Sequence, residues 1–409
     1  MVTNVLVLSN NAVLGGASRS LELMIAHLVR MDIQVKVLAP SGRACSAWEA
    51  AGAEVRLWSS PTCSWFAKPL FATYSGEYSF DRILFMLTEI IFLPFRLITA
   101  QKLIRSIVSR EQIEIIFVNT VALFWLSRTL EKIRIKDHVK VFWQIREVLN
   151  PRLPNYLYQR IGRKIASASS KLIAISSNEA SAFNSLAPVE IIHNPVPLDW
   201  PQDPPRRVLR KPATIGMASA YRPSKGIQEY FTIAEIIHRE LPDTVFLLYS
   251  PNPMTPNIRN YFRIFRTLAY RLSEKLFLSM DLLVNMTKVS YKDSIQIIYD
   301  RDLIWDNFLA MDIYIRPDRS GSPWGRDIIE AMWSGLPVVA TGSNQEFIEH
   351  GKTGILVEPG RPEYLAQAIL DLLRDDKQYQ RMSLSSADRA RSLFDKQKYH
   401  DRLILLFKE

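Results

Sequence analysis

Short apolar segments alternate along the chain with longer stretches that have helical spacing. In the first half the apolar segments are rich in β-branched residues: NVLVLS, VKVLAP, IEIIFVNT, VKVFWQI, KLIAISS and VEIIHN. The pattern resumes after residue 212 with ATIGMAS, TVFLLYS, SIQIIY, DIYIRP, LPVVAT and TGILVEP. Buried strands that alternate with helices predict parallel sheets covered on both faces. The expected fold class is therefore α/β, with two Rossmann-like domains.

A proline-rich stretch, HNPVPLDWPQDPPRRVLRKPAT, separates the two series. Its prolines stand at positions 195, 197, 201, 204, 205 and 212, a density that excludes a helix or a central strand. We expect an N-terminal domain over 1–199, a C-terminal domain over 200–390, and a last helix over 391–409 that packs back on the N-terminal domain. The alternative, a long loop inside one domain, is disfavoured by the matching series on both sides.

Both halves open with a strand, a glycine-containing turn and an amphipathic helix. Strand 4–9 leads through NNAVLGGAS, and strand 214–218 leads through SAYRPSKG. Folds of this kind bind ligands at the carboxyl ends of their strands, so two facing domains would enclose a cleft. The expected inner faces of the two helices are Leu21, Ile25, Leu28 and Val29 in the first, and Phe231, Ala234 and Ile237 in the second.

The two turns carry candidate phosphate-binding groups. Gly15 and Gly16 allow a close approach of the backbone to a ligand at a helix N-terminus; the alternative is an ordinary surface turn. Arg222 and Lys225 in YRPSKG suit a diphosphate, since arginine offers a planar fork and lysine a point charge. Here the alternative is a solvated basic turn.

The stretch SGSPWGRDIIEAMWSGLPVVATG, 320–342, places a carboxylate behind another glycine turn. Ser322 could cap the helix with Pro323 in its first turn, and Arg326 could simply pair with Glu330. We expect Glu330 on the face turned away from the core, where it could accept hydrogen bonds from a ribose, each contributing roughly 1.5–3 kcal/mol. The opposite face is expected to be buried through Ile328, Ile329, Met332 and Trp333.

The segment WGRDIIEAMWSGLPVVATGSNQEFIEHGKTGILVEPGRPEYLAQAILDLL resembles the donor-nucleotide region of GT-B-fold glycosyltransferases of the retaining family 4 type, the glycosyltransferase group 1. Other blocks resemble that family in the same order: LGGASRSLELMIAHL, VFWQIREV, KLIAISSNEASAF, EIIHNPVPLD and YRPSKGIQEYF. The resemblance covers nearly the whole chain and is weakest over 57–105 and 251–292.

The resemblance implies transfer of a sugar from a nucleotide-diphosphate donor to a glycan or lipid-linked acceptor, with retention at the anomeric carbon. It implies no metal and no resident cofactor. Glu330 matches the residue that binds the donor ribose, and Arg222 and Lys225 match the pair that neutralises the diphosphate. The implied donor-binding set also contains Gly15, Gly16, Ser322, Trp324, Gly325, Arg326 and Asp327; the acceptor or cleft set is Asn119, Gln144, Arg146 and Glu147.

The chain departs from the family pattern at three positions. Ser322 replaces a glutamate expected to contact the donor sugar, so Asp318 or Asp327 would have to substitute for it. Gln144 replaces a histidine, and Ala220 stands where the family arginine is expected. These departures leave a second hypothesis open: a catalytically weak or inactive relative that binds nucleotide sugars as the partner of another transferase.

Charge and apolar stretches raise the question of further partners. A net charge of +10 favours anionic partners, but no nucleic-acid-binding module is recognisable. The apolar stretch 83–100 is interrupted by charged residues and a proline, and residues 257–275 have the pattern of a basic amphipathic helix. Two interpretations of these segments remain open: peripheral contact with an anionic membrane, and ordinary packing inside the protein. The Asp-x-Asp at 300–302 is explained better by turn chemistry than by a metal.

The chain opens with MVTNVLVLSNN, which lacks a basic region and a long apolar run. We therefore expect no secretory signal. Cys45 and Cys63 form no disulfide framework. The expected location is the cytoplasm, with association at the cytoplasmic face of a membrane as an option.

Overall fold

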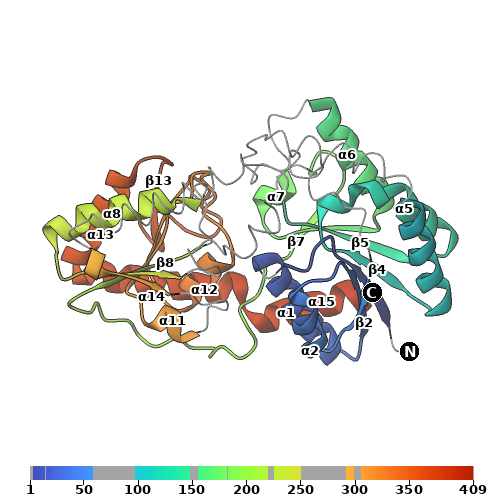
Figure 1. The fold of residues 1–409 in the computed structure, drawn as a ribbon, viewed down its shortest axis with the longest axis horizontal. Coiled ribbons are helices and arrows are strands. Elements are labelled where there is room, and N and C mark those ends of the chain that lie inside the picture. Colours follow the sequence, from blue (N-terminus) through green and yellow to red (C-terminus); the bar gives the residue numbers. More distant parts are fainter. Residues whose placement is uncertain are drawn as a thin grey trace, which may run out of the picture. The chain divides into compact units, whose positions relative to one another are not determined.

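The computed structural model describes residues 3–13, 15–58, 97–147, 155–181, 183–219, 225–249, 292–298 and 305–408. The chain divides into two compact units (Figure 1). The first comprises Met1–Asp199 and Phe394–Glu409, and the second comprises Trp200–Leu393.

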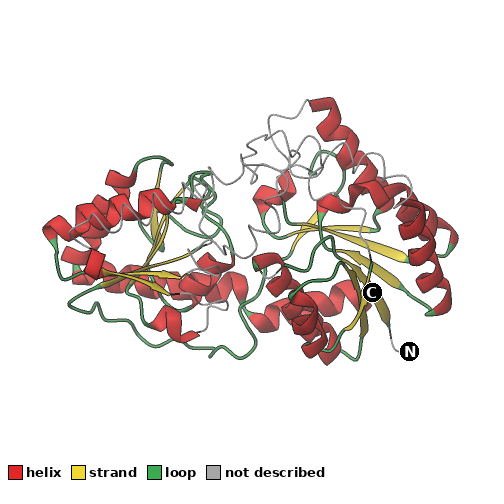
Figure 2. Cartoon of the chain, in the orientation of Figure 1, coloured by secondary structure: helices red, strands yellow, loops and turns green. Residues whose placement is uncertain are grey.

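The first unit is built on a parallel sheet with the strand order β3-β2-β1-β4-β5-β6-β7 among the described residues. Helices cover the sheet (Figure 2), including one that contains residues 97–110. The strands are β1 (Asn4–Leu8), β2 (Gln34–Ala39), β3 (Glu54–Leu57), β4 (Ile115–Val118), β5 (Lys140–Ile145), β6 (Lys171–Ala174) and β7 (Val189–Ile191). The helices are α1 (Gly16–Arg30), α2 (Ala44–Ala50), the 3-10 helix η2 (Val121–Leu126), α5 (Ser127–Lys136), α6 (Asn155–Ala168), α7 (Ser177–Ser181) and α15 (Lys396–Lys408).

The second unit repeats this plan with the parallel order β10-β9-β8-β11-β12-β13. Its strands are β8 (Thr214–Ala218), β9 (Val245–Tyr249), β10 (Ile295–Ile298), β11 (Ile313–Arg316), β12 (Val338–Thr341) and β13 (Gly354–Val357). Its helices are α8 (Ile227–Glu240), the 3-10 helix η5 (Lys292–Ser294), α11 (Trp305–Leu309), α12 (Arg326–Trp333), α13 (Pro362–Arg374) and α14 (Asp376–Phe394). The predicted α/β fold class with two parallel sheets is confirmed.

Strand order reverses once in each sheet, between β1 and β4 in the first and between β8 and β11 in the second. Doubly wound folds bind ligands at such a switch point, beyond the carboxyl ends of the strands. The loops that follow β1, β4, β8 and β11 are therefore the places where a site is expected.

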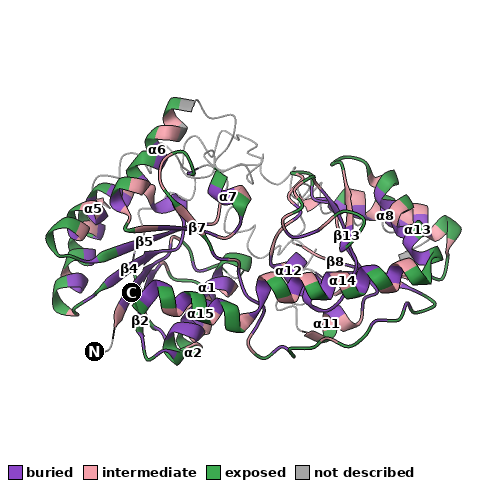
Figure 3. Cartoon of the chain, turned by 180° about the vertical axis from the view of Figure 1, so that it is seen from behind, coloured by how far each residue is buried: buried purple, intermediate pink, exposed green. Residues whose placement is uncertain are grey.

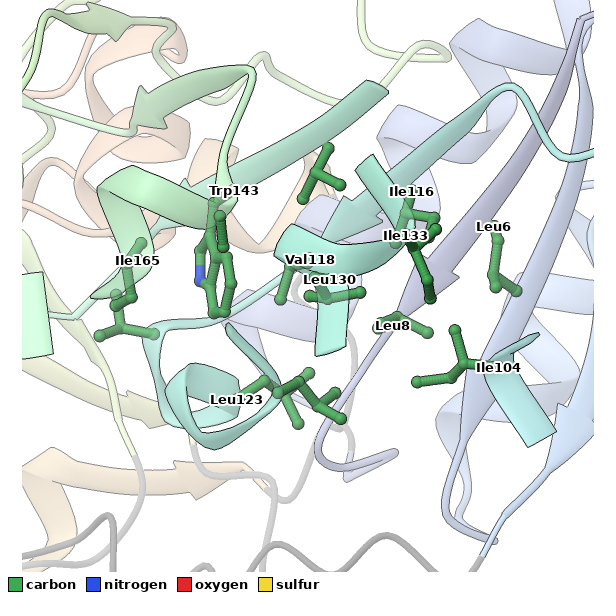
Figure 4. Packing of buried hydrophobic residues seen from close by; sticks show 14 of the residues in the cluster. Leu6, Leu8, Ile104, Ile116, Val118, Leu123, Leu130, Ile133, Trp143 and Ile165 are labelled. Atoms are coloured by element: carbon green, nitrogen blue, oxygen red, sulfur yellow. The ribbon is translucent and has the colours of Figure 1, made fainter. Parts of the chain in front are cut away.

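Side-chain alternation along β1 divides the first core into two layers. Leu6 and Leu8 pack in one cluster with Ile116 and Val118 of β4 (Figure 4). Val5 and Val7 pack on the other face, where α1 and α15 contribute apolar side chains. Burial on both faces (Figure 3) explains why the strands read as nearly continuous apolar runs.

The last helix, α15, packs on the first unit. Its buried residues Tyr399, Leu403, Leu406 and Phe407 belong to the cluster that contains Val5 and Val7. The ring of Phe407 stacks on Phe117 with centroids 6.0 Å apart. The helix before it, α14, runs past residue 391 to Phe394.

Two details of the expected helix faces were wrong or incomplete. Val29 is 37% exposed because it lies at the edge of the face that Leu21, Ile25 and Leu28 bury. In α8, Phe231 is only partly buried. The inner face of α8 consists instead of Ile227, Tyr230, Ile233, Ala234 and Ile237.

The proline-rich connection is fixed to the second unit by a buried arginine. Arg207 is 8% exposed. Its guanidinium donates hydrogen bonds to the carbonyl oxygens of Phe308 (2.9 Å), Leu309 (3.1 Å), Met311 (3.0 Å) and Ser334 (2.9 Å). These carbonyls lie at or just beyond the C-terminal ends of α11 and α12, where a helix leaves acceptors unpaired and favours a positive charge.

Candidate functional site

Lys225 and Gly226 lie between β8 and α8, at the switch point of the second sheet. Gly226 has a φ of 76°, and a Cβ there would lie 1.8 Å from the carbonyl oxygen of Pro317. Only glycine suits this close approach. The glycine thereby places Lys225 directly beside the loop that follows β11.

Asp318 anchors this lysine from the neighbouring loop. Its carboxylate is buried and accepts a hydrogen bond from Lys225 Nζ at 2.7 Å. It also accepts hydrogen bonds from the backbone N–H of Ser320 at 2.8 Å and from the Ser320 hydroxyl at 2.5 Å. Burial alone would raise the pKa of Asp318, but Arg316 and Lys225 hold it below its ordinary value. Asp318 is therefore an ionised anchor for the lysine.

Asp327, in the first turn of α12, belongs to the same network. It accepts hydrogen bonds from Arg316 and, at 2.8 Å, from the hydroxyl of Tyr314. Burial and the Asp327 charge raise the pKa of Tyr314 well above its ordinary value. Asp318 and Asp327 therefore both pair with cations inside the protein, as Glu330 does with Arg326.

The N-terminus of α12 differs from the expected one. The N-cap residue is Gly325, with no side-chain cap, and the helix begins at Arg326, so the alternative of a cap at Ser322 with Pro323 in the first turn does not apply. Ser322 instead contacts the Ser320 hydroxyl at 2.8 Å. Gly325 has a φ of 153°, and a Cβ there would lie 2.6 Å from Asp327 Oδ1. Trp324 is partly exposed beside this glycine.

Glu330 is buried, at 2% exposed, so the prediction that it faces away from the core was wrong. The helix is buried on nearly all sides, and the alternation expected for a surface helix does not apply. Glu330 Oε1 accepts hydrogen bonds from Arg326 Nε at 3.1 Å and from Nη2 at 2.8 Å. The ion pair between Arg326 and Glu330, which the sequence analysis left open, is thus present, and both side chains are buried.

The first unit presents its own polar groups at the carboxyl ends of β1, β4 and β5. Gly15 and Gly16 begin α1, are exposed, and an added Cβ at Gly15 would meet no atom within 4 Å. Asn119 directly follows β4 and is 5% exposed. Its Oδ1 is buried and has no hydrogen-bond partner among the described residues.

Glu147, just after β5, is tied to the start of η2. Its carboxyl group accepts hydrogen bonds from the Thr120 hydroxyl at 2.6 Å and from the Val121 N–H at 3.2 Å. Burial raises the pKa of Glu147 despite these bonds. Gln144 Oε1 accepts a hydrogen bond from Arg146 Nε at 2.8 Å, and Arg146 Nη1 lies 3.4 Å from the Ala17 carbonyl oxygen.

The predicted residues that the structure describes thus fall into two sets, one around each switch point. The structure adds residues that the sequence analysis did not assign, chiefly Arg316, Tyr314 and Thr120. A signal was present for two of them: tyrosine and arginine interrupt the apolar run DIYIRP at positions 314 and 316. Thr120 carried none, because its partner Glu147 lies 27 residues away, just after the next strand.

Several predicted features lie outside the described residues. They are Arg222 and Ala220, the Asp-x-Asp at 300–302, residues 83–96 of the first apolar stretch and the whole of 257–275. In the part of the chain that the structure describes, no group of three or more His, Cys, Asp or Glu side chains is placed to hold a metal ion. No helix in that same part is long and apolar enough to cross a membrane.

Comparison with known proteins covers both units. The family described as Glycosyltransferase Family 4 matches residues 14–200, and the family described as Glycosyl transferases group 1 matches residues 212–375. A phosphatidyl-myo-inositol mannosyltransferase of Mycobacterium leprae is 34% identical over 84 residues, which are 20% of this chain and 22% of that protein. The matches to curated relatives span only 8–22% of those proteins' lengths.

Solved structures match along the whole chain. Anabaena Alr3699/HepE, crystallised with UDP and glucose, has a TM-score of 0.68 at 17% identity and covers 99% of each chain. A mutant of S. aureus TarM, crystallised with fondaparinux, alpha-GlcNAc-glycerol and UDP, has a TM-score of 0.66 at 11% identity and covers 100% of each chain. At these identities the similarity establishes the fold, which is that of GT-B glycosyltransferases. The family matches to the two units and this shared fold together show that the chain belongs to the group 1, family 4-type glycosyltransferases.

Proposed function

We propose that this chain transfers a sugar from a nucleotide-diphosphate donor to a glycan or lipid-linked acceptor, with retention of the anomeric configuration. The observation that carries the proposal is the switch point of the second sheet. There Lys225 is anchored by Asp318, beside the start of α12, whose N-cap glycine leaves backbone N–H groups without a side-chain cap. A cation beside a helix N-terminus is suited to a diphosphate.

In this proposal the second unit binds the donor, and Lys225 stabilises the diphosphate as it leaves. Removing one such electrostatic donor typically lowers a rate by about 10²–10³-fold. Arg222 precedes Lys225 in the same turn of the sequence, and we assign it to the same diphosphate. The proposal assigns the ribose hydroxyls to Glu330, whose charge is already balanced by Arg326.

The first unit is assigned to the acceptor side. An added Cβ at Gly15 would meet no atom within 4 Å, and the buried Asn119 Oδ1 accepts no hydrogen bond from the described residues. Gln144 and Arg146 form a bonded pair at the end of β5. We expect Asn119, Gln144 and Arg146 to contact the acceptor and the transferred sugar, and Gly15 and Gly16 to approach the donor phosphate as well, without participation of a metal ion.

The proposal is tested by calorimetry of UDP, GDP, ADP and TDP and their common sugar conjugates. UDP comes first because the similar structures contain it. We expect one nucleotide to bind selectively and Lys225→Gln to weaken binding about ten- to a hundredfold. The matched control is Lys377→Gln, an exposed lysine on α14 of the same unit. If no nucleotide binds at about millimolar concentration, or if both variants bind like wild type, the donor site is misassigned.

A second candidate function is supported by the departures from the family pattern. Ser322 offers no carboxylate to the donor sugar, and Gln144 is hydrogen-bonded to Arg146. A chain of this kind would bind nucleotide sugars as the partner of another transferase. Measuring donor consumption and product formation separates the two functions, because the partner would bind the donor without consuming it. NMR of the product's anomeric proton then tests retention.

Membrane association at the cytoplasmic face is a further part of the proposal. The net charge of +10 would favour an anionic surface, where a lipid-linked acceptor would be presented. Flotation with liposomes that contain anionic lipid, at low salt, tests it. A protein that stays entirely in the unbound fraction would remove the membrane from the proposal.

A further inference from the structure

A second group of basic side chains lies in the first unit, where α15 packs beside α1 (Figure 1). His27 of α1 is 2% exposed. Its Nδ1 lies 3.3 Å from Nδ1 of His400 on α15. The ring of Tyr399 meets the His27 ring edge-on, with centroids 5.1 Å apart. Because His27 and Gly16 lie near opposite ends of α1, this group is separate from the candidate acceptor site.

A pocket of about 330 Å³ opens at these histidines. Arg30, in the last turn of α1, is exposed at its rim. Lys396 enters from the start of α15 and donates a hydrogen bond to the Leu198 carbonyl oxygen at 2.8 Å. Among the described residues, no carboxylate lines the pocket, which is completed by Leu198 and Gln397. The lining is therefore entirely basic or neutral.

All of the resolved influences on His27 lower its pKa. Burial, followed by the nearby His400, Arg30 and Lys396, lowers the pKa of His27 to about 4. His27 Nε2 is buried and makes no hydrogen bond with the described residues. An anion in the pocket would reverse this balance, because it would favour protonation of the histidines and give their N–H groups a charged acceptor.

We propose that this pocket binds a phosphate-type oxyanion through Arg30, Lys396, His400 and His27. The shared chemistry is that of a free phosphate or diphosphate and of a lipid phosphate headgroup. Two imidazole nitrogens can also hold a metal ion, but metal sites in proteins need further ligands, and Arg30 and Lys396 repel a cation. Binding would join α1 to α15 and so stabilise the docking of the C-terminal helix on the first unit.

The test is calorimetric titration of the full chain with inorganic phosphate and with pyrophosphate at constant ionic strength. Arg30→Gln is the principal variant, since Arg30 is exposed and contacts no described side chain by hydrogen bond or ion pair. His400→Gln is the second variant. Arg128→Gln, an exposed arginine on α5 of the same unit, is the matched control. Titrations in Lys225→Gln separate this pocket from the proposed donor site.

We expect Arg30→Gln and His400→Gln each to weaken binding by about tenfold or more, and Arg128→Gln and Lys225→Gln to retain a wild-type phosphate site. If soluble phosphate does not bind but phosphatidylglycerol vesicles do, with the same sensitivity to both variants, the anion is a lipid headgroup.

Three results would overturn the proposal. The first is binding of phosphate or vesicles that is equally strong in Arg30→Gln, His400→Gln and the control. The second is the failure of both probes to bind the wild-type chain. The third is stoichiometric binding of Zn²⁺ that depends on His400 and that phosphate does not weaken, because the histidines would then form a metal site.

Discussion

Arg207 is expected to hold the proline-rich connection and the ends of α11 and α12 together. Its replacement by methionine keeps most of the aliphatic volume but removes the guanidinium that donates to four carbonyl groups. A hydrogen bond to a charged group contributes about 1.5–3 kcal/mol, but such bonds to one group are not additive. Leaving buried acceptors without their donor costs about 1–3 kcal/mol, whereas removing the buried charge relieves its own desolvation. We therefore expect Arg207→Met to destabilise the second unit by about 1–3 kcal/mol.

Equilibrium unfolding in urea, combined with hydrogen exchange resolved by peptide, measures this effect. The two units can unfold separately, so exchange of 305–311 and 326–336 reports the second unit, and exchange of β1 and β4 reports the first. The matched control is Arg206→Met, the exposed arginine one position earlier. Equal stability of the two variants, or a loss shared evenly by both units, would refute the role assigned to Arg207.

Three further predictions concern the second unit. Glu330→Ala leaves Arg326 buried without its carboxylate and should cost about 3–5 kcal/mol in urea unfolding; unchanged stability would mean that the pair is dispensable. Gly226→Ala forces a Cβ against backbone and should lower stability by about 1–3 kcal/mol and weaken nucleotide binding, whereas a variant that melts like wild type would contradict the close approach. Burial alone would raise the pKa of Asp318, but Arg316 and the lysine beside it hold that pKa below its ordinary value of 3.8. The ionised carboxylate therefore stabilises the folded chain above pH 3.8, and this stabilisation is lost as the pH falls through the lower pKa of the folded state. Asp318→Asn should be less stable than wild type at neutral pH and should lose less stability in acid; parallel profiles for the two proteins would argue against this linkage.

Apolar periodicity predicted the buried strands because a parallel sheet covered on both faces requires continuous apolar runs. It missed β3, where Glu54 and Arg56 alternate with apolar residues at the edge of the sheet and pair with each other. It also misplaced Glu330, because the helical pattern assumes one solvated face and α12 is buried nearly all round.

Long-range partners account for what the sequence analysis did not assign. Arg207 stands in a segment whose prolines suggest only a linker, and its acceptors lie about a hundred residues further along the chain. Lys225 and Asp318 were both singled out, but their pairing depends on the order in which β8 and β11 lie in the sheet. Local spacing thus predicted the candidate residues, whereas the fold determined which of them meet.

Donor binding at the second switch point is tested most directly by hydrogen exchange of the full chain with and without a saturating nucleotide sugar, beginning with UDP-glucose. We expect slower exchange over 226–229, which follow Lys225, and over 325–330, at the start of α12, with no change at the His27 pocket. The absence of protection in both segments with every nucleotide sugar tested, or protection confined to the first unit, would contradict the claim that the second switch point binds the donor.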